Sequence, residues 1–191
     1  MMSGMQNQVQ KPATTRTAIL NKAADLFSEK SYAGTSMSDL AEGLGLSKAA
    51  IYHHFESKES ILMNLVNSTF QDMGELVQQI EALPANKVDP SDVLRRFAEI
   101  LFAHRQVVSL VLFQLPAELR THGIERQDYM VRLQKILAGK NPTLERRIRA
   151  RAATTIIATG IVPPPFGKLL GKDETDLLLL VSIAIDALKD D

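Results

Sequence analysis

The sequence predicts an all-α protein, and three observations lead to this expectation. Apolar residues recur at the helical spacing i, i+3, i+4, i+7 in successive segments, and no segment keeps the strict alternation of a half-buried strand. Aromatic residues make up only 5% of the chain, and the abundance of Ala and Leu favours helix. No unit of about 20 to 50 residues repeats, which argues against a solenoid. We expect about nine helices, three of them in a small N-terminal head.

The composition is that of a folded globular chain, and it restricts the classes of function. The 191 residues are 45% apolar, and 22 basic residues balance 22 acidic ones, so any DNA binding must come from local placement of charge. The absence of cysteine excludes disulfides, thiolate metal sites and a cysteine nucleophile, and it fits the cytoplasm. Neither a leader-like segment nor an apolar run of about 18 to 20 residues is present, so we expect no membrane partner.

Three helices are expected in the head. The first runs over about residues 13–30 and ends in "SYAGTS". Ser36 is a natural N-cap for a short second helix, Gly45 follows that helix as a turn, and Ser47 caps a short third helix. The apolar positions that define these helices are Ile19, Ala23, Leu26 and Phe27, then Met37, Leu40, Ala41 and Leu44, then Ile51.

A much longer helix follows the head. Ser57 caps a pattern that keeps one apolar stripe as far as Leu83, which corresponds to a helix about 37 Å long. "PANKVDPS" is a linker, and its Asp89-Pro90 pair begins the next helix. Later helices are expected at about 91–104, 106–115, 123–138, 143–161 and 173–188.

The last two expected helices each carry an apolar face. The first of them is predicted to open with Asn141 as its cap and Pro142 in the first helical position. Its expected inward face is Leu144, Ile148, Ala152, Thr155 and Ile156. The final helix is apolar at Leu177, Leu178, Val181, Ile185 and Leu188.

The stretch "LGLSKAAIYHHFESKE" at residues 44–59 permits three interpretations: a metal site, an acid/base pair, or a surface that reads another molecule. Adjacent residues on a helix point about 100° apart, so His53 and His54 cannot share one ion. No catalytic partner converges with Glu56 or Glu59, and no G-x-S-x-G, P-loop or dinucleotide fingerprint occurs. We therefore expect no enzyme, no metal and no cofactor.

The reading-surface interpretation explains more residues. A helix-turn-helix needs an apolar face on its first helix, a small residue at the contact, a glycine turn and an apolar anchor on its second helix. Leu40, Ala41, Leu44, Gly45, Leu46 and Ile51 supply these features in order. The second helix then turns Lys48, Ala49, Tyr52 and His53 to solvent, and it is short enough to enter a major groove about 12 Å wide.

The run "ILNKAADLFSEKSYAGTSMSDLAEGLGLSKAAIYHHFESKESIL", residues 19–62, resembles the DNA-binding head of the TetR family of transcriptional regulators. Its most specific parts are "GTSM", "LGLSKAAIYHHF" and "SKE". The resemblance implies binding of a double-stranded DNA operator. The DNA-facing positions are then Ser36, Ser38, Ser47, Lys48, Ala49, Tyr52, His53, His54 and Lys58.

Individual roles follow from the same resemblance. Ser36 would cap the second helix against a phosphate, Ser47 and Lys48 would open the recognition helix, and Lys58 would meet a phosphate. Ser38 stands where the family often has arginine, which removes a phosphate or base contact. Lys11 and Arg16, near the arm, would contact a phosphate or the minor groove. Alternatives stay open: Tyr52 packs over the helix junction, Lys48 is an ordinary solvated lysine, His54 is buried against the first helix, and Lys11 and Arg16 are unstructured basic residues.

The body is expected to dimerise and to bind a ligand. In TetR-like proteins the last two long helices pair with their copies, and residues 143–161 and 173–188 fit that role. Helices of the body would enclose a pocket for an apolar or amphipathic effector, which would swing the long helix over 58–82 and spread the two heads. The arginine run at 146–151 is interpreted as a solvated face. Expected pocket residues are Met63, Phe70, Phe97, Leu101, His104, Phe113 and Tyr129.

The sequence thus predicts a disordered arm over 1–12, a helix-turn-helix domain over 13–57, and a ligand-binding and dimerisation domain over 58–191. The expected function is that of a homodimeric, nucleoid-associated repressor that a small molecule releases from a palindromic operator. The alternative is a helical small-molecule-binding or interaction protein that no longer reads DNA, which the neutral charge and Ser38 suggest.

Overall fold

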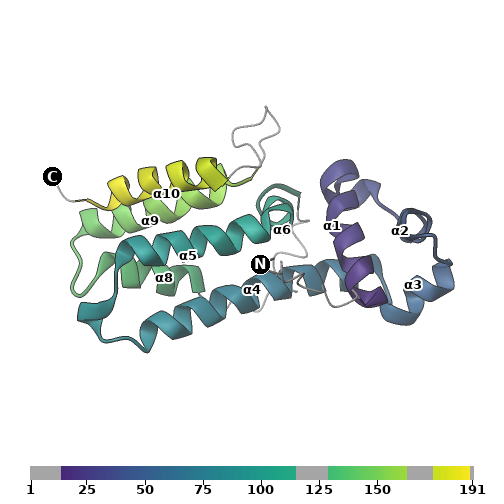
Figure 1. Cartoon of the computed structure of the whole chain (residues 1–191), viewed down its shortest axis with the longest axis horizontal. Helices are drawn as coiled ribbons and strands as arrows, with labels where there is room; N and C mark the ends of the chain where they lie inside the picture. Colours follow the sequence, from purple (N-terminus) through teal and green to yellow (C-terminus); the bar gives the residue numbers. More distant parts are fainter. Residues whose placement is uncertain (1–13, 115–128, 163–173, 190–191) are drawn as a thin grey trace, which may run out of the picture. The chain divides into compact units, whose positions relative to one another are not determined.

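The computed structural model describes residues 14–114, 129–162 and 174–189, and within these ranges it contains nine α-helices and no strand. The predicted all-α class is confirmed. Two compact units divide the chain, a head unit over residues 1–62 and a body unit over residues 63–191. Figure 1 labels their helices along the sequence. Within the described residues, no helix combines the length and the apolar character that crossing a membrane requires.

Helix α1 spans Thr15–Gly34, and the side chain of Thr14 caps it by accepting the Thr17 N–H. Its last turn is irregular, because Ser31 has φ 67° and ψ 162°. The sequence predicted an end near residue 30, and this interruption of the regular helix lies at that place. The buried hydroxyl of Thr35, just after the helix, faces the carbonyl oxygens of Leu26 at 3.1 Å and Ser31 at 2.9 Å.

Helices α2 (Met37–Leu44) and α3 (Lys48–His54) meet at the predicted glycine turn. Gly45 has φ 64°, in the left-handed region that a side chain rarely adopts, and its N–H bonds back to carbonyls of α2. Ser36 and Ser47 accept backbone N–H groups at the start of their helices, so both predicted caps are confirmed. The head core consists of Ile19, Phe27, Leu40, Ile51, Phe55, Ile61 and Leu62.

Helix α4 spans Lys58–Glu81, and its first turn belongs to the head unit. A short 3₁₀ turn, Ala85–Lys87, leads to α5 (Pro90–Ala103), where Asp89 caps the first turn as predicted. Helix α6 (Arg105–Ser109) then widens into a π-helical turn, η2 (Leu110–Gln114). The sequence predicted one plain helix here, and a π turn of this kind depends on packing that periodicity does not report.

Helices α8 (Tyr129–Ala138), α9 (Leu144–Gly160) and α10 (Glu174–Leu188) complete the body unit. The predicted start of α9 is wrong by two residues. Asn141 has φ 48° and stands outside the helix, whereas Thr143 caps it by accepting the Arg146 N–H at 3.2 Å. Residues 123–128, expected to open α8, lie outside the described residues.

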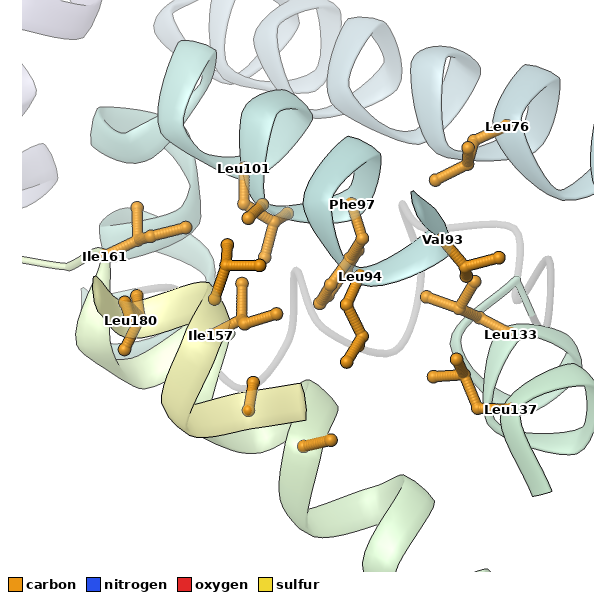
Figure 2. Packing of buried hydrophobic residues seen from close by; sticks show 14 of the residues in the cluster. Leu76, Val93, Leu94, Phe97, Leu101, Leu133, Leu137, Ile157, Ile161 and Leu180 are labelled. Carbon is orange, nitrogen blue, oxygen red and sulfur yellow. The ribbon is translucent and has the colours of Figure 1, made fainter. Parts of the chain in front are cut away.

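The core of the body unit draws on α4, α5, α8, α9 and α10 (Figure 2). Helix α9 packs along α10 and α8, and α5 packs on both α9 and α10. Gly160 makes the α9–α10 contact close, because a Cβ there would lie 2.5 Å from Leu180 Cδ1. The residues that Figure 2 labels include Leu76, Phe97, Leu133, Ile157 and Leu180.

The expected inward face of α9 is wrong at four of its five residues, whereas the fifth, Ile156, is half-buried and packs against the core. Leu144 and Ile148 are 66% and 58% exposed, and Ala152 and Thr155 are exposed as well. The residues that pack inside the chain lie on the other side of the helix: Ala150, Ala153, Thr154, Ile157 and Gly160. Helix α9 therefore carries mainly small residues and Ile157 inward, whereas Leu144 and Ile148 point outward.

Candidate nucleic-acid interface and apolar cavity

The seven residues of α3 divide between a side that packs on the head core and a side that faces solvent. Ile51 is fully buried and anchors the helix to the head core, so the opposite side must face solvent. Lys48, Ala49 and His53 are exposed, and Tyr52 is 50% exposed. Half of Tyr52 thus stays accessible on the same side as Lys48, which argues against a purely packing role for it.

The two histidines differ in environment. His53 is exposed, whereas His54 is half-buried, and their rings make an edge contact with centroids 5.3 Å apart. Phe55, which follows, is buried beneath Arg16, whose guanidinium lies 4.9 Å from the ring centre. The described residues hold no group of three or more ligating side chains suited to a metal ion.

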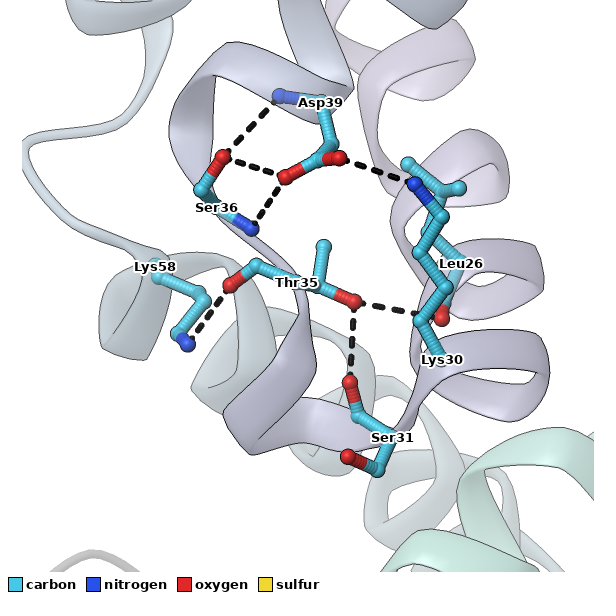
Figure 3. A network of polar contacts seen from close by, with 7 residues as sticks. All are labelled: Leu26, Lys30, Ser31, Thr35, Ser36, Asp39 and Lys58. Atoms are coloured by element: carbon cyan, nitrogen blue, oxygen red, sulfur yellow. Dashed lines mark hydrogen bonds and ion pairs between the residues drawn. The ribbon is translucent and has the colours of Figure 1, made fainter.

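The start of α2 is a closed polar network (Figure 3). The Ser36 hydroxyl accepts the Asp39 N–H at 3.1 Å and donates to the Asp39 carboxylate, which also accepts the Ser36 N–H at 2.8 Å. Lys30 donates to the same carboxylate at 2.8 Å. These hydrogen bonds, first from Lys30 and then from Ser36, hold the pKa of Asp39 well below its usual range.

This network changes what Ser36 can offer a phosphate. Its hydroxyl already donates to one partner and accepts from another, and an ionised carboxylate lies beside it. A phosphate at this helix start would therefore meet both the helix dipole and the Asp39 charge. Ser38, one residue into α2, is exposed and carries no such partner among the described residues.

Lys58 does not extend freely to solvent. Its ammonium group donates to the carbonyl oxygens of Tyr32 and Thr35, each at 2.7 Å, and lies 4.4 Å from the centre of the Tyr32 ring. Figure 3 shows the bond to Thr35. An ammonium group has three hydrogens, so one remains for a phosphate. The expected contact of Lys58 thus competes with a structural one.

An apolar cavity of about 140 Å³ lies in the body unit, between α4, α5, η2 and α8. Four of the expected pocket residues line it: Phe70, Phe97, Leu101 and Tyr129. Met63, His104 and Phe113 do not, and Phe113 is 56% exposed. The sequence missed the aliphatic part of the lining, because valine and leucine at helical spacing look the same in any core. That part is Val66, Val107, Val108, Val111 and Leu112.

Tyr129, which lines the cavity, and His104, which does not, both contact α4. Tyr129 lies so close to α4 that a Cβ on Gly74 would be 2.6 Å from its Cζ, so only glycine leaves room for the ring. His104 contacts another part of α4, with its Nε2 2.6 Å from the Asp72 carboxylate. The histidine therefore joins the end of α5 to α4 rather than entering the cavity.

A protein-family model described as bacterial regulatory proteins, tetR family, matches residues 19–65, the segment that contains α2, α3 and the Lys58 contact. This part of the chain is therefore similar to the TetR family of regulators. Two curated relatives each match part of the chain. The negative transcriptional regulator IcaR of the icaADBC biofilm operon of Staphylococcus aureus is 39% identical over 59 residues, which are 31% of this chain and 32% of IcaR. The regulator EthR of Mycolicibacterium smegmatis is 38% identical over 87 residues, 44% of this chain and 38% of EthR.

Solved TetR-family structures match nearly the whole chain. A transcriptional regulator from Aquifex aeolicus superposes with a TM-score of 0.71 at 26% identity, over 92% of this chain and 98% of that one. PfmR of Thermus thermophilus gives 0.66 at 28% identity, over 89% and 96%. By sequence, however, the chain spans only about a third of the length of the curated relatives named above. The family likeness is therefore strongest in the head, and the body shares mainly its fold.

Proposed function

We propose that this chain is a TetR-family DNA-binding transcriptional regulator that acts as a repressor. The observation that carries the proposal is the exposed face of α3, which presents Lys48, Ala49, Tyr52 and His53 beyond a glycine turn. A helix of this length and polarity suits the major groove, where its first residues reach base edges. The named relative IcaR is a negative regulator, which supports repression rather than activation.

The DNA contacts divide into positioning and reading. Lys48 and the N–H groups at the start of α3, next to Ser47, hold phosphates, while Tyr52 and His53 meet base edges. Ser36 and Ser38, at the start of α2, lie along the sugar-phosphate backbone of the DNA. His54 adds a DNA contact from its half-buried position. Lys58 adds its remaining hydrogen to a phosphate while it keeps its two carbonyl acceptors.

The proposed regulator acts as a homodimer joined through α9 and α10. These helices expose large apolar side chains that the chain itself leaves uncovered: Leu144, Ile148, Leu178, Leu179 and Ile183. Several large apolar side chains exposed on two helices that pack together are costly in water and favour an interface. A second copy of the chain supplies the same apolar face, so a two-fold dimer buries the faces of both copies. The two recognition helices of such a dimer then read a palindrome.

A small apolar molecule in the body cavity controls operator binding. The volume of about 140 Å³ is close to the roughly 150 Å³ that accommodates benzene in an engineered cavity, and well below a drug-sized pocket. Thr69 and Tyr129 bring hydroxyl groups to an otherwise apolar lining. Helix α4 contributes Val66, Phe70 and Met73 to the cavity and begins in the head unit, so it is the element through which occupancy reaches the head.

Selection from a random pool of double-stranded DNA tests the proposal. Purified full-length protein should enrich a palindrome with half-sites about 34 to 36 Å apart or somewhat further, and its affinity should fall steeply with salt. A benzene-sized ligand should shift that affinity by about 5- to 150-fold. If no sequence is enriched although small apolar molecules still bind, the chain is a ligand-binding protein that has lost DNA reading.

A further inference from the structure

A second groove in the body unit lies between α8 and α9 and is separate from the apolar cavity. It has a volume of about 480 Å³ and is formed by α8, the turn at Gly139, and the first half of α9. Its apolar wall is Val131, Ala138 and Pro142. Three exposed basic residues also line it: Lys135 of α8, and Arg147 and Arg151 of α9.

The arginines at the start of α9 fall into two groups. Arg146 donates to the Leu188 carbonyl oxygen at 2.6 Å, and Arg149 pairs with Glu145 at 2.8 Å, so both make contacts within the folded chain. Arg147 and Arg151 instead line the groove. Within the ranges that the structure describes, no carboxylate pairs with either of them or with Lys135.

This arrangement is electrostatically unfavourable without a partner. Arg147 and Arg151 are four residues apart on one helix, a spacing at which like charges repel. Lys135 lines the same groove from α8 and carries a third charge of the same sign. An anion between the two helices would relieve all three, because one negative group can accept hydrogen bonds from several cationic donors.

We propose that this groove binds a small anionic amphiphile, with a phosphate or carboxylate head group on Lys135, Arg147 and Arg151 and an apolar tail on Val131, Ala138 and Pro142. The groove volume falls within the range of small-molecule sites, and its combination of an apolar wall with convergent charges matches such a ligand. The site stands on the body unit alone and does not depend on DNA binding.

Calorimetric titration of the full-length protein tests the site, with octyl phosphate below its micelle concentration as the probe. Inorganic phosphate carries the head group without the tail, and octanol carries the tail without the charge. Octyl phosphate should bind at least tenfold more tightly than either. Arg147→Gln with Arg151→Gln should weaken it at least tenfold, and Lys135→Gln alone, on the other helix, should weaken it several-fold.

Lys87→Gln is the matched control, because it removes one exposed charge outside the groove and should change the affinity by less than twofold. Four results would overturn the proposal. Equal binding of inorganic phosphate means an adventitious ion only, and equal loss in Lys87→Gln means a general charge effect. Unchanged affinity in both groove variants places octyl phosphate elsewhere, and tighter binding of an oligoglutamate peptide assigns the groove to a protein partner.

Discussion

The Lys58 ammonium group donates a 2.7 Å hydrogen bond to the Tyr32 carbonyl oxygen and lies 4.4 Å above the Tyr32 ring. A second 2.7 Å bond reaches the Thr35 carbonyl oxygen. These acceptors stand at the end of α1, where the helix leaves carbonyl groups without intrahelical partners. One lysine thus fastens the first turn of α4 to the end of α1, and both belong to the head unit.

Lys58→Met keeps the aliphatic bulk and removes both hydrogen bonds. We expect the free energy of unfolding in urea to fall by about 1 to 3 kcal/mol, because two carbonyl oxygens lose a charged donor. Lys48→Met is the matched variant, since Lys48 is exposed. It should leave stability unchanged and lower the slope of log affinity against log salt by about 0.9 per protomer. A Lys58→Met protein with full stability and a lower slope would make Lys58 chiefly a phosphate ligand.

Asp39→Asn should alter the acid sensitivity of the protein. The pKa of Asp39 lies below its ordinary value of 3.8 in the folded chain, first because of the hydrogen bond from Lys30. Its contribution to stability is therefore present above about pH 4 and is lost as the pH falls through the folded pKa. Urea unfolding between about pH 2.5 and 6 should show a smaller loss on acidification in Asp39→Asn than in the unmodified protein.

Glu56→Gln is the control for this pH series, because Glu56 is an exposed carboxylate of the same unit and has no partner among the described residues. Its profile should match that of the unmodified protein. Identical pH profiles for all three proteins would show that the Lys30–Asp39–Ser36 network does not stabilise the head.

Gly74→Ala tests the contact between α4 and Tyr129. In a Tyr129→Ala background the change should stabilise the protein by about 1 kcal/mol, the ordinary gain of Ala over Gly in a helix. With Tyr129 present the gain should vanish, because the added Cβ would lie 2.6 Å from the Tyr129 Cζ. A double-mutant cycle in urea measures the coupling, expected at about 1 kcal/mol or more. A coupling near zero would mean that Tyr129 does not pack on Gly74.

Ile148→Glu combined with Leu179→Glu tests the dimer face. These side chains are 58% and 60% exposed, so the fold should survive while a charge in each half of a two-fold interface repels its copy. Light scattering should show the mass fall from about twice 21.1 kDa to 21.1 kDa, with an unchanged helical circular dichroism spectrum. Leu83→Glu, at a similarly exposed leucine outside these helices, should remain dimeric. A double variant that stays dimeric would assign the interface to another face.

The head was predictable because its signals are local. Ser36, Ser47 and the glycine at 45 each act within one turn of the chain, and the structure places caps and a left-handed turn at these positions. The hydrogen-bond partners of Lys58 could not be predicted from the sequence, because its two acceptors precede it by 26 and 23 residues. Only the folded backbone brings them together.

The body was harder to predict for a different reason. Apolar spacing reports that residues share a helix face, but not whether that face packs inside its own chain or awaits a partner. Leu144 and Ile148 were expected inside and are exposed, while the smaller Ala150 and Ala153 are fully buried. The cavity shows the same limit, since its aromatic lining was largely anticipated and its aliphatic lining was not.

The most direct test of the central claim is the affinity of Tyr52→Ala for the selected duplex, measured by fluorescence anisotropy. If the α3 face reads DNA, affinity should fall about tenfold or more while the melting temperature and dimer mass stay unchanged, because Tyr52 is half exposed. Undiminished affinity for the selected duplex in a folded, dimeric Tyr52→Ala protein would contradict the account.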